Sequence, residues 1–110
     1  GKAILLQGRP DEALSVLRRA VELLGTPENR HLLAACLVQS GDRLEAVAVL
    51  KDLIRKHTRF APGYYALGNI YDGAGSHYSA YKMLLKAALL EPDREIFAKR
   101  LVQVQKKVPV

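Results

Sequence analysis

Hydrophobic residues recur along this chain at the spacing of an α-helix. Between residues 61 and 92, Tyr64, Leu67, Gly68 and Tyr71 follow one another at steps of three, one and three, so they share one stripe of a helix. A glycine inside a helix costs about 1 kcal/mol relative to alanine. The close approach of a second helix best explains Gly68, and the pattern therefore predicts two helices in contact.

The second helix of this segment follows a glycine turn. Gly75 can adopt the left-handed conformation that ends a helix, and Ala80, Leu84 and Ala87 then form a second apolar stripe. Pro92 cannot continue a helix and ends it. The segment is thus predicted to be an antiparallel pair, in which small alanines let the helices approach.

The same plan recurs along the chain at intervals of 33 and 34 residues. Three columns stay in step at these intervals: Gly8, Gly41 and Gly75; Ala13, Ala46 and Ala80; Leu17, Leu50 and Leu84. A period of about 34 residues is typical of stacked helical hairpins. We therefore expect further helices over Asp11–Leu24, His31–Ser40 and Arg43–His57. Such arrays usually present a surface and seldom a catalytic pocket.

The segment from 61 to 92 resembles the tetratricopeptide repeat, whose pattern is W-x2-L-G-x2-Y followed by alanines and a proline. The positions that carry the resemblance are Tyr64, Leu67, Gly68, Tyr71, Gly75, Ala80, Ala87 and Pro92. The preceding segment departs from the pattern, because Ala34 replaces the glycine, Leu37 the tyrosine and Leu53 the last alanine.

The resemblance implies an all-α fold, an α-solenoid of antiparallel helix-turn-helix repeats wound as a TPR-like right-handed superhelix, with about three repeats plus a C-terminal helix. The 110 residues would form a single TPR-like domain. Its expected parts are residues 1–26 as a partial first repeat, 27–60 and 61–92 as the second and third repeats, and 93–108 as a capping or next-repeat helix.

Residues 93–107 are predicted to form the last helix, with Asp93 as its N-cap. Its apolar stripe consists of Phe97, Leu101, Val104 and Val108. Solenoids need a terminal helix with a polar outer face. Val102 and Gln105 replace the glycine and tyrosine of the repeat, and Pro109 follows, which favours a capping helix over the first helix of a fourth repeat.

In the tetratricopeptide repeat family, a second stripe on each first helix lines a concave groove that binds peptides. By this resemblance the groove would hold Lys2, His31, Ala35, Tyr65, Asn69, Asp72, Lys99 and Gln103. An exposed aromatic ring beside an amide and a lysine suits peptide binding. The alternative is that Tyr65 only covers the neighbouring helix. Asn69, Lys99 and Arg100 also resemble pieces of a carboxylate clamp found in some members, but the clamp is incomplete.

The formal net charge of +6 is concentrated in two stretches. Their basic residues, taken together as a candidate basic patch, are Lys51, Arg55, Lys56, Arg59, Arg100, Lys106 and Lys107. A basic balance favours acidic partners through electrostatic steering, and it is also the footprint of nucleic-acid binding. The simplest reading is a solvated, charged helix surface.

Candidate catalytic chemistry is almost absent. His31, His57 and His77 have no second ligand at metal-binding spacing on their own helices. Cys36, the one cysteine, rules out an internal disulfide and is expected to be a buried structural thiol. No phosphate-binding loop or paired carboxylates are found, so we expect neither an enzyme nor a cofactor or metal site. No apolar stretch approaches the roughly 20 residues of a membrane span, and a cytoplasmic location is expected.

The sequence therefore predicts a protein–protein interaction scaffold that binds a partner peptide or helix, of acidic character, in the concave groove. Nucleic-acid binding through the basic patch is the alternative. It is disfavoured because Lys51–Arg59 lies on a second helix, away from the groove, with no aromatic residue among its basic ones. A third hypothesis is self-association through the N-terminal end, where Leu14, Leu17 and Val21 form an apolar face.

Overall fold

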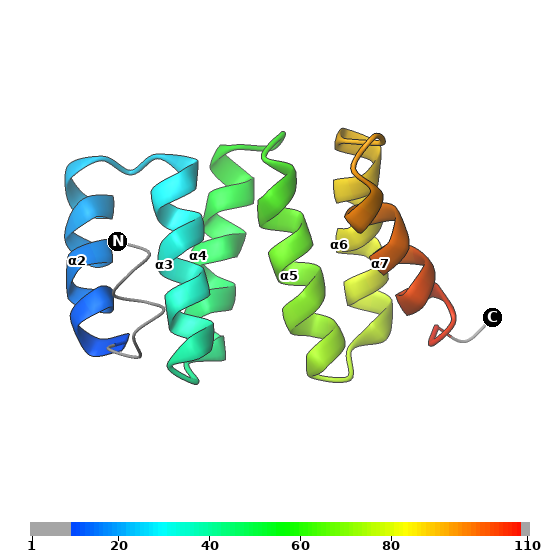
Figure 1. Ribbon diagram of the computed structural model, residues 1–110, viewed down its shortest axis with the longest axis horizontal. Helices are drawn as coiled ribbons and strands as arrows, with labels where there is room; N and C mark the ends of the chain where they lie inside the picture. Colours follow the sequence, from blue (N-terminus) through cyan, green and yellow to red (C-terminus); the bar gives the residue numbers. More distant parts are fainter. Residues whose placement is uncertain (1–9, 109–110) are drawn as a thin grey trace. The chain divides into compact units, whose positions relative to one another are not determined.

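The computed structural model describes residues 10–108, and within these residues it contains helices and no strands (Figure 1). The six described helices are α2 (Pro10–Leu23), α3 (Pro27–Gln39), α4 (Arg43–Lys56), α5 (Ala61–Gly73), α6 (His77–Leu90) and α7 (Glu95–Gln105). The predicted all-α class is confirmed. The chain divides into two compact units, Gly1–Arg55 and Lys56–Val110.

In the first unit, α2 packs against α3, and two ion pairs tie both helices to α4. Arg18 of α2 donates to both carboxylate oxygens of Glu45, at 2.5 and 2.9 Å. Arg30 of α3 donates to Asp52 at 2.8 Å. The core of this unit is formed by the residues that the apolar stripes predicted, among them Ala13, Leu33, Ala34, Leu37, Ala46, Leu50 and Leu53.

In the second unit, α6 packs against both α5 and α7. Ala80, Leu84 and Val104 are fully buried at the centre of this contact. The close approach predicted at Gly68 is confirmed, because a Cβ atom built there would lie 2.6 Å from Cγ of Leu84 and 3.3 Å from the carbonyl oxygen of Ala80. Gly68 is therefore the point at which α5 and α6 touch.

The turns within the helix pairs depend on left-handed glycines. Gly41 and Gly75 have φ angles of 85° and 84°, a conformation that residues with a side chain rarely adopt. After the second of these turns, the backbone N–H of Ser76 donates to the carbonyl oxygen of Tyr71 at 2.8 Å. This bond closes the end of α5 and places the start of α6 beside it.

Two predicted helix starts were wrong. Helix α3 begins at Pro27, four residues before His31, because Thr26 accepts a hydrogen bond from the backbone N–H of Asn29 at 3.1 Å and so caps the helix. Helix α7 begins at Glu95, and Asp93 is not its N-cap. The backbone N–H of Arg94 bonds to the carbonyl of Glu91, so Asp93 belongs to the preceding turn.

Candidate functional site

Polar side chains from three helices meet around one carboxylate in the second unit. We call Asn69, Asp72, His77, Arg100 and Lys107 the Asp72 cluster. Asp72 accepts from Arg100 at 2.7 Å and from Lys107 at 3.3 Å, and its other oxygen lies 2.8 Å from Nδ1 of His77. Nε of Arg100 donates to the amide oxygen of Asn69 at 2.8 Å. The cluster therefore joins α5, the first turn of α6, α7 and the turn that follows α7.

Asp72 is the buried member of this cluster, with 5% of its side chain exposed. Burial alone would raise the pKa of Asp72. The hydrogen bonds from His77 and Lys107 and the positive charges of Lys107 and Arg100 outweigh burial and lower this pKa below its ordinary value. Asp72 is thus a carboxylate at neutral pH, and cationic residues of the same chain compensate its negative charge.

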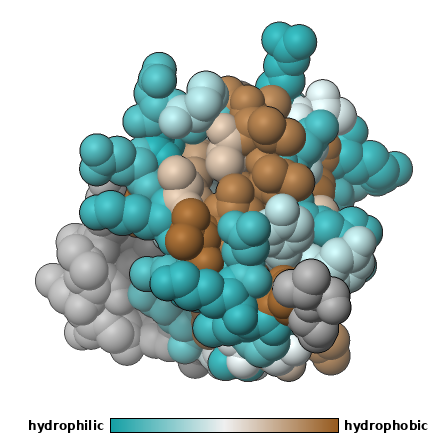
Figure 2. All heavy atoms as spheres, turned by 90° about the vertical axis from the view of Figure 1, so that its right-hand side faces the viewer, coloured by the Kyte–Doolittle hydropathy of each residue, from teal (hydrophilic) through white to brown (hydrophobic). Residues whose placement is uncertain are grey.

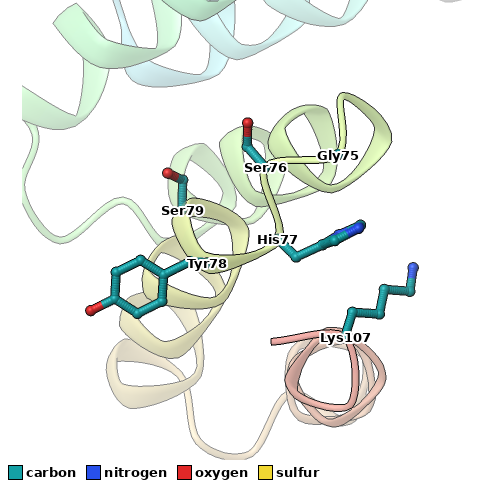
Figure 3. A pocket seen from close by; sticks show the side chains of 6 residues that line it. All are labelled: Gly75, Ser76, His77, Tyr78, Ser79 and Lys107. Atoms are coloured by element: carbon teal, nitrogen blue, oxygen red, sulfur yellow. The ribbon is translucent and has the colours of Figure 1, made fainter. Parts of the chain in front are cut away.

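An open pocket of about 460 Å³ lies beside the Asp72 cluster (Figure 3). The residues that line it are Gly75, Ser76, His77, Tyr78, Ser79 and Lys107. In Figure 3 the ring of His77 and the ammonium group of Lys107 converge, whereas Tyr78 points away from Lys107. No carboxylate lines the pocket, so its charged groups are cationic.

The groove residues predicted on α5 and α7 differ in how far their side chains are buried and in what they contact. The ring of Tyr65 is half-buried, and its centroid lies 4.9 Å from that of Phe97, so Tyr65 does cover the neighbouring helix. Lys99 and Gln103 are exposed. The amide oxygen of Gln103 accepts from Arg100 at 3.1 Å, which links Gln103 to the Asp72 cluster.

In the first unit, the predicted groove residues His31 and Ala35 both belong to α3. His31 is half-buried, and burial lowers the pKa of its imidazole. Ala35 is exposed and offers only a methyl group. Lys2 lies outside the described residues.

Two profiles, each described as "Tetratricopeptide repeat", match the chain, one over residues 5–67 and the other over residues 61–94. The chain belongs to the tetratricopeptide repeat family. Tetratricopeptide repeat proteins bind other proteins, and such scaffolds are generally non-catalytic. The fold and family are therefore those of a protein–protein interaction scaffold.

Solved structures of other tetratricopeptide repeat proteins share the fold. The crystal structure of MamA superposes with a TM-score of 0.84 at 24% sequence identity, over 97% of this chain and 63% of MamA. That of YrrB, described as a TPR protein with an unusual peptide-binding site, superposes with a TM-score of 0.81 at 28% identity, over 98% of this chain and 54% of YrrB. The chain thus spans less than two thirds of either structure. A comparison with curated protein sequences gave no match.

Several residues of the candidate basic patch of this tetratricopeptide repeat chain form ion pairs within the protein. Arg100 and Lys107 are paired with Asp72, which partly compensates their charges. Arg55 is paired with Asp52, which also binds Arg30. The side chains of Lys51, Lys56, Arg59 and Lys106 are exposed.

Two further features concern possible chemistry. Cys36 is fully buried, and burial raises the pKa of its thiol, as expected for a structural cysteine. Among the described residues, no group of three or more His, Cys, Asp or Glu residues could hold a metal ion. A search of the same residues finds no helix that is long and apolar enough to cross a membrane.

Figure 2 shows apolar side chains exposed on one face of the second unit. Leu89 of α6 and Ile96 and Val102 of α7 are exposed apolar residues. On α2, where self-association was predicted, Leu17 is buried and Leu14 and Val21 are half-buried, whereas Val16 and Leu23 are exposed. Self-association stays a prediction.

The sequence did not predict the roles of His77 and Lys107. The partner of His77 is not on its own helix, because Asp72 lies five residues earlier, across the turn at Gly75. A carboxylate at the end of one helix and a histidine at the start of the next were a usable signal. Lys107 was not predictable in this way, since it lies 35 residues from Asp72.

Proposed function

We propose that this chain binds an extended or helical segment of a partner protein, without catalysis, and that the segment is acidic. In the second unit the segment would lie over Tyr65, Asn69, Lys99 and Gln103. The observation that carries the proposal is the ordered polar surface shared by α5 and α7, in which Arg100 holds both Asn69 and Gln103.

This order matters for affinity. Each side chain that must be fixed on binding costs about 0.5–1.5 kcal/mol. The hydrogen bonds from Arg100 already fix the amides of Asn69 and Gln103, and their oxygens point at Arg100, which leaves their N–H groups to donate to a partner. The ring of Tyr65 is likewise held against Phe97. The surface therefore needs little ordering when a peptide arrives.

The acidic character of the partner follows from the distribution of charge. Residues 56–110 contain nine Lys and Arg against four Asp and Glu, whereas residues 1–55 contain eight against seven. The second unit thus carries a net charge of +5 out of +6. One of its four acids, Asp72, is neutralised by Arg100 and Lys107, and another, Glu91, pairs with Arg94 at 3.1 Å. The similarity to YrrB, a protein described as having a peptide-binding site, also supports peptide binding.

The test uses acidic peptides selected from a display library on the 110-residue chain, with affinities measured by titration calorimetry. Lys99→Ala should weaken binding about five- to tenfold, because it removes an exposed charge from the proposed surface. Lys86→Ala removes an exposed charge from α6 and is the matched control, with affinity expected to be unchanged. Equal effects of the two variants would count against the proposed surface.

Tyr65→Ala should also weaken the peptide, but it removes the ring contact with Phe97 as well. The free energy of unfolding of this variant must therefore be measured beside its affinity. Loss of binding by a variant that still unfolds cooperatively supports a direct contact.

Nucleic-acid binding has less support, since Arg100 and Lys107 are engaged by Asp72. A salt titration with single-stranded RNA tests it. No binding at about 50 mM salt removes this alternative, and a steep loss of affinity with salt would favour it.

A further inference from the structure

The pocket between the first turn of α6 and the end of α7 is cationic. Lys107 places its ammonium group 3.3 Å from each oxygen of Asp72, and 47% of its side chain is exposed. An ammonium group has three donors, so it can bind Asp72 and still donate into the pocket. The single charge of Asp72 faces two permanent cations, Arg100 and Lys107, which leaves the Asp72 cluster with an excess of one positive charge.

The hydrogen bond between Asp72 and His77 fixes the tautomer of the histidine. A carboxylate can only accept, so the proton of a neutral His77 must lie on Nδ1, the atom 2.8 Å from Asp72. Nε2 then carries a lone pair when His77 is neutral and an N–H group when it is protonated. No hydrogen bond to Nε2 occurs within residues 10–108, and 34% of the side chain is exposed.

We propose that this pocket binds an oxyanion, a carboxylate or phosphate group on a side chain of a protein partner, and that binding is coupled to protonation of His77. Lys107 supplies a permanent charge, and His77 supplies a second donor only when it is protonated. The pocket volume of about 460 Å³ falls within the range of small-ligand sites, which is about 300–1,000 Å³. The first turn of α6 lies at the same pocket, and the positive end of its dipole has the same sign as these side chains.

The charged groups that surround His77 are Asp72 from α5, Arg100 from α7 and Lys107 from the turn after α7. Because the pKa of Asp72 is lowered, Asp72 stays ionised throughout the range in which histidines titrate, about pH 5–8. Arginine and lysine side chains are ordinarily charged in that range. Among the residue types in the cluster, histidine is the one that ordinarily gains or loses a proton near neutral pH.

The inference rests on the proposed function only for the source of the oxyanion, and its test is separate. Sulfate is the first probe, because its charge does not change between about pH 6 and pH 8. It is titrated into the whole chain at constant ionic strength while backbone amide resonances are followed by NMR. The amides of Ser76–Ser79 and Lys107 should shift, with affinity about fivefold higher at the lower pH. Shifts that spare these residues would overturn the proposal.

Three variants separate the contributions. His77→Gln should keep a hydrogen bond to Asp72 and lose the dependence on pH. Lys107→Gln should lower affinity about tenfold, whereas Lys106→Gln removes the neighbouring, exposed charge and should have no effect. If Lys106→Gln and Lys107→Gln weaken sulfate equally, or if the pH dependence survives in His77→Gln, the site is wrong.

The source of the oxyanion is tested with matched peptides that carry Glu, phosphoserine, Gln or Ser at one position. The Glu or phosphoserine peptide should compete with sulfate, and the Gln and Ser peptides should not. Competition by RNA and by none of the peptides would overturn the assignment to a protein partner. Equal effects of Lys99→Ala and Lys86→Ala on peptide binding, with sulfate binding intact, would count against the peptide-binding surface alone, so the two proposals fail independently.

Discussion

At the scale of single residues, the closest packing constraint is the contact of Gly68 with Leu84. Leu84 is fully buried, and its Cγ and Cδ2 atoms would lie 2.6 and 2.9 Å from a new Cβ atom on Gly68. Cγ is a branch point near the backbone and cannot turn away as the end of a flexible chain can. Any side chain at Gly68 must therefore push α5 and α6 apart.

Gly68→Ala should destabilise the chain by about 1–3 kcal/mol, because overpacking outweighs the better helix propensity of alanine. Gly73→Ala is the matched control on the same helix, since a Cβ atom there meets nothing within 4 Å. That variant should be neutral or more stable by about 0.5 kcal/mol. Urea unfolding followed by circular dichroism measures both. A stabilised Gly68→Ala would show that the helices are less tightly packed than described.

At the scale of helices, Asp72 is the carboxylate that holds α5, α6 and α7 together at one point. Its pKa is lowered in the folded chain, so the folded state binds this proton less tightly than the unfolded chain does. The stabilisation is therefore complete above the ordinary pKa of 3.8, and it is lost as the pH falls through the lower folded value.

Asp72→Asn should destabilise the chain by about 1–3 kcal/mol at neutral pH, since Arg100 and Lys107 lose their charged acceptor. It should also flatten the loss of stability below about pH 4. Glu45→Gln is compared with it, because the hydrogen bond from Arg18 lowers the pKa of Glu45 as well. Denaturant unfolding at several pH values gives both slopes. An unchanged acid slope in Asp72→Asn would contradict the proposed role.

The buried faces of the helices followed the local sequence pattern. The stripes through Leu50, Leu67 and Leu84 gave the buried faces, because the period of a helix fixes which residues share a side. The early start of α3 was missed, although threonine is a common N-cap residue and proline is common at the first helical position, as at Thr26 and Pro27.

The contacts of Arg100 and Lys107 within the Asp72 cluster could not be predicted from the sequence, for a different reason. They join residues 28, 31 and 35 positions apart, and these meet only after α7 has packed beside α5 and α6. The sequence identified Asn69, Asp72 and Lys99 as candidates on the stripe it expected, but it could not tell which of them would already be occupied by Arg100. Tyr65 was expected to be exposed and is half-buried for the same reason, since Phe97 covers it.

At the scale of the whole molecule, the charge is uneven. Net charge governs association rates more than folding. The excess of five positive charges in residues 56–110 should therefore attract an acidic partner before the two molecules touch. Salt at about 0.15 M limits this effect to separations of about 8 Å.

Lys99→Glu should slow association with an acidic peptide about three- to tenfold at low salt, and the difference should shrink as salt is added. Lys51→Glu makes the same change in net charge on α4, in the less charged first unit, and should have a smaller effect. Stopped-flow fluorescence measures both rates. If Lys51→Glu slows association as much as Lys99→Glu, overall charge and not its location controls the encounter.

The bond from Lys107 to Asp72 ties the end of α7 to a turn that precedes it by more than thirty positions. Helix ends normally fray independently, with opening energies near zero. Here Lys107, two residues after the end of α7, is held by a buried carboxylate, so fraying of this end should be accompanied by loss of the bond from Lys107 to Asp72. Amide hydrogen exchange at this helix end and at the turn at Gly75 should therefore report one shared opening event. The free energy of opening at the end of α7 should then match that of the middle of its unit.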